Sequence, residues 1–250
     1  KENSDKWLKD ASFINNYNQN INENYKFNIE SALQTSKNYI QKTNPNDTLS
    51  YSSSLSSSIK LSGYNLNIID DKLEVNLKAY QSNQNNENNK TIPTVLPHIT
   101  YYSGLRTYKN NNYINNFEFY NIFRETSTDI HSKSQRKLST KFTIEKEKII
   151  YGSKINYGLD FYNQFFNVED KKINNEHKDS NYFRSFPIFG IDIQAPFKFK
   201  QSKTNFTYTP YLSFVITPGI SNSEKISNED SSVNTFQIDN NKKTNRFTGN

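Results

Sequence analysis

Apolar and polar residues alternate one by one over many short stretches of this chain. Successive side chains of a β-strand point to opposite faces, so a period of two predicts strands with one apolar and one polar face. Serine fills the polar positions of 49–61, which we interpret as strand with a wet inner face rather than as a flexible linker. The predicted strands lie around 25–29, 49–61, 73–79, 117–119, 138–144, 155–161, 191–193 and 206–216, with a break at Pro210 in the last of them.

The composition is polar on average yet rich in aromatic residues. The mean hydropathy is −0.91 and 33% of the 250 residues are hydrophobic, values that by themselves suggest disorder. However, the chain holds 17 Tyr and 18 Phe, and these aromatic residues follow the alternation. Such a chain fits a folded surface that is apolar on one side and polar on the other.

Membrane insertion through helices is excluded by the pattern, because no apolar run approaches the roughly 20 residues that a spanning helix needs. Strands can cross a bilayer only in a closed barrel, where every backbone group is paired. We therefore predict an all-β fold: an incomplete antiparallel transmembrane β-barrel, about ten to twelve strands of a larger barrel. Long polar loops are expected at 81–90, 167–180 and 221–244, and residues 28–42 come nearest to a helical pattern.

Residues that carry enzyme chemistry are sparse. The chain has no Cys, and we expect His98, His131 and His177 to be surface residues. No Gly-x-Ser-x-Gly motif and no phosphate-binding glycine loop occurs, and the lysines behind the net charge of +6 are scattered. We predict no enzyme, no catalytic residue, no metal, no cofactor and no nucleic-acid partner.

Three motifs follow one another in the second part of the chain. The first, 91–101, opens a strand at Pro93 and Pro97, and proline is tolerated at a strand end or edge. The second begins with Arg184-Ser-Phe-Pro187, where Pro187 is expected to mark a strand start, and continues through 190–197. The third comprises Asn228, Glu229, Asp230 and Ser231, then Asn245, Arg246, Phe247 and Gly249.

Together, in this order and spacing, the motifs resemble the lipopolysaccharide-assembly outer-membrane protein family, LptD. The resemblance runs from about residue 91 to the end, and its hallmarks are 228–231 and the Asn-Arg-Phe-x-Gly stretch. Ser227 stands where the family usually has Pro, and Lys243-Thr244 replaces a common Leu-Phe pair. From the residues alone, Glu229 and Asp230 either pair with Arg246 across a loop or form an exposed acidic turn.

The resemblance implies transport rather than catalysis. It implies lipopolysaccharide insertion into the outer leaflet, a location in the outer membrane of a Gram-negative bacterium, and a lipoprotein partner, LptE, that plugs the lumen. It also implies contact with periplasmic bridge proteins through an N-terminal jellyroll, and the hallmark residues would form a structural loop or line the substrate path.

Two alternatives stay open at this point. One is another outer-membrane barrel, such as a porin or a TonB-dependent receptor, and the other is a soluble β-rich binding protein. For the domains, we expect one partial barrel over residues 1–250, weakly assigned over 1–90, with the jellyroll and the C-terminal half of the barrel absent.

Overall fold

The computed structural model describes residues 10–67, 69–83, 88–201, 204–218, 223–227 and 246–249. These residues form an almost entirely β structure with a few short helical turns. The first strands and helical segments are β1 (Ser12–Asn20), β2 (Tyr25–Gln34), α1 (Tyr39–Thr43), η1 (Thr48–Tyr51), β3 (Ser54–Tyr64), β4 (Lys72–Ser82) and η2 (Asn89–Thr91). The others are β5 (Thr94–Tyr102), β6 (Arg106–Tyr108), β7 (Asn111–Phe123), β8 (Ser134–Ile150), β9 (Ser153–Ile173), β10 (Glu176–Gln194), β11 (Phe197–Gln201), β12 (Thr204–Tyr208), β13 (Tyr211–Ile216) and β14 (Arg246–Gly249).

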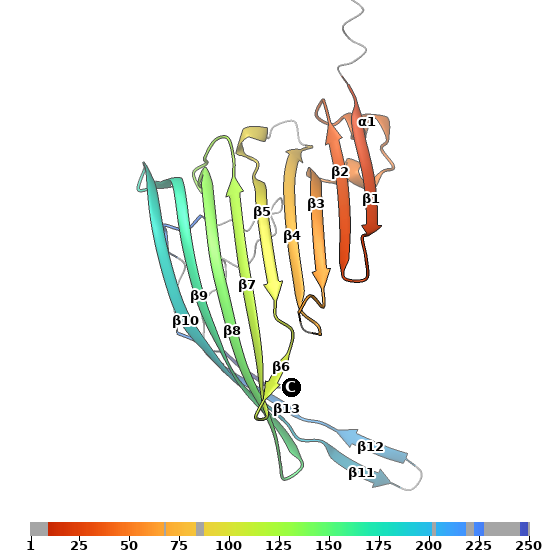
Figure 1. Ribbon diagram of the computed structural model, residues 1–250, viewed down its shortest axis with the longest axis vertical. Coiled ribbons are helices and arrows are strands. Elements are labelled where there is room, and N and C mark those ends of the chain that lie inside the picture. The colour runs from red at the N-terminus through yellow and green to blue at the C-terminus, as the bar shows by residue number, and fades with distance from the viewer. Residues whose placement is uncertain are drawn as a thin grey trace, which may run out of the picture.

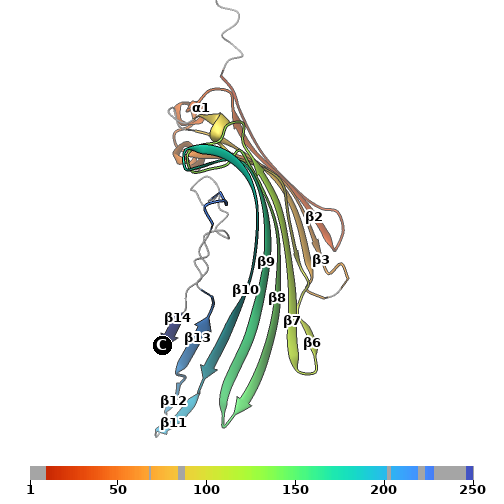
Figure 2. The same ribbon diagram turned by 90° about the vertical axis from the view of Figure 1, so that its left-hand side faces the viewer.

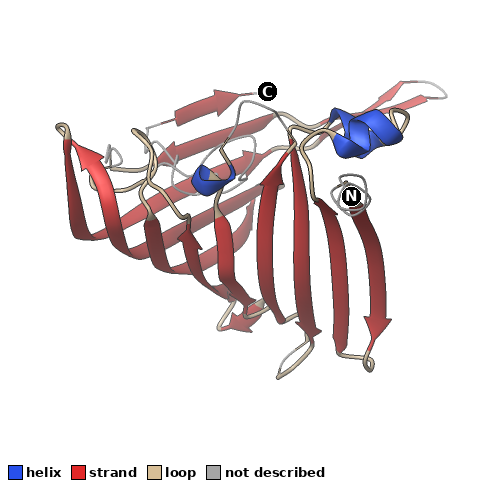
Figure 3. Ribbon diagram, turned by 90° about the horizontal axis from the view of Figure 1, so that it is seen from above, coloured by secondary structure: helices blue, strands red, loops and turns tan. Residues whose placement is uncertain are grey.

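One large antiparallel sheet contains twelve of these strands (Figure 1). Its order follows the chain from β1 to β5, then β7 to β10, β13 and β14, with the short β6 paired to β7. Strands β11 and β12 form a separate hairpin that projects from the lower end in Figure 1. The sheet is strongly curved (Figures 2 and 3), and among the described strands its two ends, β1 and β14, do not pair. The predicted incomplete antiparallel sheet is confirmed.

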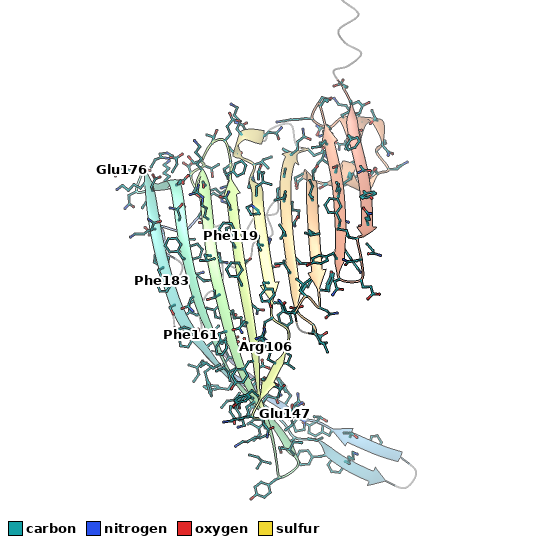
Figure 4. All side chains as sticks on the ribbon, viewed as in Figure 1. Arg106, Phe119, Glu147, Phe161, Glu176 and Phe183 are labelled. Carbon is teal, nitrogen blue, oxygen red and sulfur yellow. The ribbon has the colours of Figure 1, made fainter. Side chains whose placement is uncertain are left out.

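Apolar side chains form continuous rows across the convex face. One row runs through Ile99, Phe119, Leu138, Phe165 and Phe183 on five successive strands. Figure 4 labels Phe119 and Phe183 of this row, together with Phe161, which lies on the same face of β9 and pairs with Phe142. Phe165 and Phe183 are 44% and 61% exposed, so no second layer from the described part of the chain covers these rows. Their aromatic residues are therefore not buried between two sheets.

The concave face carries the alternate residues, which are mainly polar. Buried apolar residues among those described form small clusters: Ala32 with Ile40 and Leu55, Val95 with Tyr120 and Ile122, and Phe166 with Val168 and Ile226. Apolar burial is consequently slight for a chain of this size, and the backbone ladders supply the main continuity of the fold.

The predicted strands correspond well to observed ones. The stretches at 25–29, 73–79, 117–119, 138–144, 155–161 and 191–193 lie in β2, β4, β7, β8, β9 and β10, and Pro210 separates β12 from β13. The serine-rich stretch forms η1 and then β3, which pairs with β2 and β4. The weakly assigned region before residue 90 supplies β1 to β4 of the same sheet, and the helical pattern at 28–42 resolves into the end of β2 and the short α1.

The loop predicted at 167–180 is wrong. Strands β9 and β10 instead continue through it and are joined by Asn174 and Asn175, whose φ angles are 51° and 65°. Positive φ at both central residues is what a two-residue type I′ hairpin turn requires, and Asn tolerates it. The strands extend beyond their apolar residues into a polar stretch, which the alternation could not reveal. The loop predicted at 81–90 is shorter than expected, since β4 continues to Ser82 and η2 starts at Asn89, and most of 221–244 lies outside the described residues.

The prolines differ in their placement. Pro93 directly precedes β5, whereas Pro97 lies within that strand at a shift of register with β7. Pro187 lies in the interior of β10, opposite Phe161, so the expectation of a strand start there is wrong. Among the described residues β13 pairs with β10 only from Phe189 onward, so Pro187 lies where the sheet has an edge, a position that tolerates proline. No helix within the described ranges is long and apolar enough to cross a membrane.

Candidate functional site

The centre of the concave face, on β7 to β10, is built from polar residues of four neighbouring strands. Glu118, Ser139, Gln164 and Arg184 form one row across these strands. The next row contains Tyr120, Lys137, Phe166 and Tyr182, with His98 before it on β5. We call these two rows the inner-wall cluster. Each member is placed here by the period of two, which turns every second residue toward the concave side.

Glu118 is the charge centre of the inner-wall cluster. Its carboxylate lies 3.0 Å from Nε2 of His98 and 3.2 Å from Nζ of Lys137. The Lys137 side chain is fully buried and its ammonium lies 5.3 Å from the Tyr120 ring centre. A buried cation is tolerated only when it is paired, so Glu118 and the aromatic face together hold it.

Arg184 belongs to the row of Glu118 and also contacts Phe166 in the row of Tyr120. Its Nε donates a hydrogen bond to Oε1 of Gln164, whose Nε2 donates to Oγ of Ser139 at 3.3 Å. The guanidinium lies 5.2 Å from the ring centre of Phe166, a cation–π distance. Arg184 is buried, so the arrangement fixes the wall instead of presenting a free cation to a ligand.

A segment distant in sequence lies against this cluster. Ile226 packs on Phe166, Val168 and Tyr182, and the backbone N–H of Ser227 donates to Oε1 of Gln135 at 2.8 Å. Figure 2 shows the short blue segment 223–227 on the concave side of the sheet. Residues 223–227 therefore lie inside the curve of the wall.

Charged loops and turns surround the ends of the sheet. Nζ of Lys172 donates to Oδ1 of Asp129 at 2.6 Å, and this hydrogen bond, with the charge of the same ammonium, lowers the pKa of Asp129. Lys90 and Glu125 form a similar exposed pair, whose hydrogen bond raises the pKa of Lys90. Glu147 marks the lower end and Glu176 the upper end in Figure 4.

Within the described ranges, no cluster of three or more His, Cys, Asp or Glu residues could hold a metal ion. The polar groups named above serve one another as partners. The arrangement presents a hydrophilic surface on one face of a single sheet and an apolar surface on the opposite face.

Comparison with protein families decides between the remaining alternatives. The sequence model of LptD, the LPS transport system D family, matches residues 11–250. The chain belongs to this family. Comparison with curated proteins gave no match. Membership of LptD assigns the chain, in general terms, to lipopolysaccharide transport and assembly at the outer membrane, and the family consists of transport proteins rather than enzymes.

The LptD match extends the resemblance found in the sequence. The motifs suggested relatedness only from about residue 91, whereas the family match begins at residue 11 and includes the strands before it. Those strands carry the same two-faced pattern: Phe27, Leu61, Val75 and Ile99 form one row on the apolar face. The first strands are therefore part of the family's sheet, although their sequence resembles it only in style.

The residues expected to be hallmarks of the family are described only in part. Asn228, Glu229, Asp230, Ser231 and Asn245 lie outside the described residues, and so do the side chains of Arg246 and Phe247. The expected pairing of Glu229 and Asp230 with Arg246 thus stays a prediction. The backbone of β14 pairs with β13, which joins the Arg-Phe-x-Gly stretch to the wall.

Sequence reasoning missed several members of the inner-wall cluster. His98 was expected at the surface, but its side chain is 22% exposed and bonds Glu118. Arg184 was part of a motif with no assigned role, and Lys137 was not singled out. The polar phase of the alternation, continued across β7 to β9, was the signal that could have found Glu118 and Lys137.

Proposed function

We propose that this chain forms part of the wall of an outer-membrane barrel that inserts lipopolysaccharide into the outer leaflet. The two-faced sheet is the observation that supports this function. Its convex face carries exposed aromatic and aliphatic rows suited to lipid, and its concave face carries hydroxyl, amide and charged groups suited to a wet lumen.

The two faces suggest separate paths for the polar and the apolar parts of an amphiphile. The saccharide portion of lipopolysaccharide passes along the polar concave side, where hydroxyl and amide groups can replace its water. The acyl chains leave through a seam between the first and last strands of the whole barrel and enter the bilayer. No bond is made or broken in this protein, and the energy comes from an ATPase in the inner membrane.

We infer the partners from membership of the family. An outer-membrane lipoprotein, LptE, plugs the lumen, and periplasmic bridge proteins deliver the lipid through an N-terminal jellyroll of the whole protein. Residues 1–250 then act as one partial barrel domain. The hallmark residues at 228–231 and 245–249 serve as a structural loop or line the substrate path in this proposal.

Exposure of the aromatic rows argues against the soluble alternative. Phe161 and Phe183 are 39% and 61% exposed, whereas a β-sandwich buries such residues between two sheets. A porin or TonB-dependent receptor shares the two faces, and the family match favours LptD over both.

Depletion and complementation test the proposal. The full-length gene would be placed under a repressible promoter in its native host, and lipopolysaccharide at the cell surface would be measured during depletion. We expect newly made lipopolysaccharide to accumulate inside the envelope, and the purified protein to carry a lipoprotein partner. Normal surface delivery after depletion would contradict the proposal.

A further inference from the structure

The segment 223–227 crosses the concave face outside any strand ladder. Ser227 is fully buried and Ile226 is 6% exposed, although both belong to an irregular segment. An irregular segment is buried against a hydrated wall only where specific partners bond it. The reason is that its backbone N–H and C=O groups must find hydrogen-bond partners when they leave water.

Gln135 is the polar partner of this segment. Its side-chain amide accepts from the backbone N–H of Ser227 at 2.8 Å and donates to the carbonyl oxygen of the same residue at 3.3 Å. Gln135 therefore binds both backbone groups of one residue, as a neighbouring strand would. Its Nε2 also donates to the hydroxyl of Tyr120 at 3.0 Å, which helps to fix the amide orientation.

Two further hydrogen bonds hold the segment on either side. The backbone N–H of Ser132 donates to Oγ of Ser227 at 3.0 Å. Oγ of Ser180 donates to the carbonyl oxygen of Lys225 at 3.1 Å. The segment is thus tied to the loop before β8 and to β10, and it lies across the strand between them.

Apolar contact completes the binding site. Ile226 packs on Phe166 and Val168, which are both fully buried, with Tyr182 beside them. Phe166 and Val168 are apolar, but they lie at positions of β9 whose side chains point to the mainly polar concave face, the side that otherwise faces the lumen. Removing the segment would expose this apolar shelf to water, so the wall is built to keep Ile226 in place.

From these contacts we propose that residues 223–227 form a fixed strut on the inner wall, with Gln135 and the Phe166–Val168 shelf as positioning residues. The strut holds the chain on the lumen side immediately before Asn228, where the family hallmark begins. Its role in transport rests on the function proposed above, but the contact itself does not. Ser227, which replaces the usual Pro of the family, contributes an N–H that proline lacks, and that N–H is the donor to Gln135.

Cross-linking tests the contact in the full-length protein in outer membranes. This chain has no Cys, so Ser132→Cys with Ser227→Cys introduces the only possible disulfide within it. We expect mild oxidation to form this disulfide, seen by mass spectrometry, while the control pair Ser139→Cys with Ser227→Cys stays reduced. Ser139 lies on the same face of β8 as Gln135, the partner of Ser227, but farther along the strand. Equal cross-linking of both pairs, or of neither, would overturn the strut.

Transport by the locked protein separates a strut from a gate. We expect surface lipopolysaccharide to be equal in the oxidised and reduced forms, since a fixed strut need not move. A block that a reducing agent relieves would show that the segment must leave the wall, and would contradict the proposal. If the unmodified protein also fails to deliver lipopolysaccharide, the proposed function fails while the contact still stands.

Two substitutions test the positioning role. Ile226→Asp places a charge on the apolar shelf, so we expect the cross-link rate to fall by at least about tenfold. Surface lipopolysaccharide should also fall while the gel shift of the heat-modifiable folded barrel is unchanged. Ile226→Leu keeps the apolar contact and should restore both readouts. Wild-type transport by Ile226→Asp with its cross-link lost would show that the strut does not position anything that transport needs.

Discussion

Glu118 and Lys137 are diagonal neighbours on adjacent strands of the inner wall, with the carboxylate 3.2 Å from a fully buried ammonium. His98 contacts the same carboxylate at 3.0 Å. The wall therefore neutralises its own buried charge. These paired groups serve the structure of the wall and differ in this from any charged group that contacts a substrate. Pairs of this kind are costly to break because the partner left behind stays buried.

Replacing Glu118 tests this dependence. Glu118→Gln removes the negative charge that faces Lys137, and we expect a loss of about 3–5 kcal/mol of unfolding free energy. The change Glu118→Gln with Lys137→Met removes both charges and should recover most of that loss. Urea unfolding of the folded full-length barrel in lipid vesicles measures both variants. Equal stability of the single variant and the unmodified protein would refute the dependence.

A charge on the convex face should be tolerated poorly. Phe161→Arg puts a cation among the exposed apolar rows, and a lipid-facing Arg near the bilayer midplane costs about 2–4 kcal/mol. The matched control is Asn156→Arg on the concave face of the same strand, where Glu147 and Asp192 are its neighbours. We expect the control to be nearly neutral in the same urea titration. The reverse order of the two variants would mean that the faces are assigned the wrong way round.

The hairpin turn between β9 and β10 depends on asparagine. Both Asn174 and Asn175 have positive φ, a conformation that costs a branched residue roughly 1–2 kcal/mol. Asn175→Val should therefore lower the urea midpoint, and Asn175→Gly should leave it unchanged or raise it. If valine and glycine behave alike, the turn is not left-handed at this position.

Acid should loosen the loop between β7 and β8. A hydrogen bond from Lys172 lowers the pKa of Asp129, so this carboxylate stabilises the loop above its unfolded pKa of about 3.9. That contribution disappears as the pH falls through the lower folded value. We expect hydrogen exchange in 124–133, corrected for intrinsic rates, to be constant from about pH 7 to 5 and to rise below about pH 4.

Asp129→Asn is the control for the acid effect. It removes the charge at every pH, so exchange in the loop should be raised already at neutral pH and should show no step on acidification. An acid step of the same size in this variant would assign the effect to another group, such as the neighbouring Asp170, which bonds Ser127 and His177.

Alternation predicted the sheet but not the lengths of its strands. The period of two is visible only where apolar residues mark one face, so 138–144 and 155–161 were found inside β8 and β9. Both strands continue into stretches such as 167–173 where polar residues occupy both faces. There the antiparallel ladder extends the strand, and only the turn residues Asn174 and Asn175 signal its end.

The site was harder to predict because its members are close in space and far apart in sequence. Gln135 and Ser227 are separated by 92 residues and bind through backbone groups of Ser227, which any residue except proline offers in the same form. The motif search did find Ser227, as a departure from the family pattern, but not its partner. Predicting this contact requires both the register across β8 to β10 and the position of residues 223–227 on the concave face.

Lipid accessibility along β9 is the measurement that tests the central claim most directly. Single cysteines would be introduced at 159–166 in the full-length barrel, spin-labelled in lipid vesicles, and compared for collision with oxygen and with a water-soluble nickel reagent. We predict that labels at 159, 161, 163 and 165 contact lipid, while those at 160, 162, 164 and 166 contact water or protein. Aqueous exposure at the odd positions, or no alternation at all, would contradict a sheet that forms the wall of a membrane barrel.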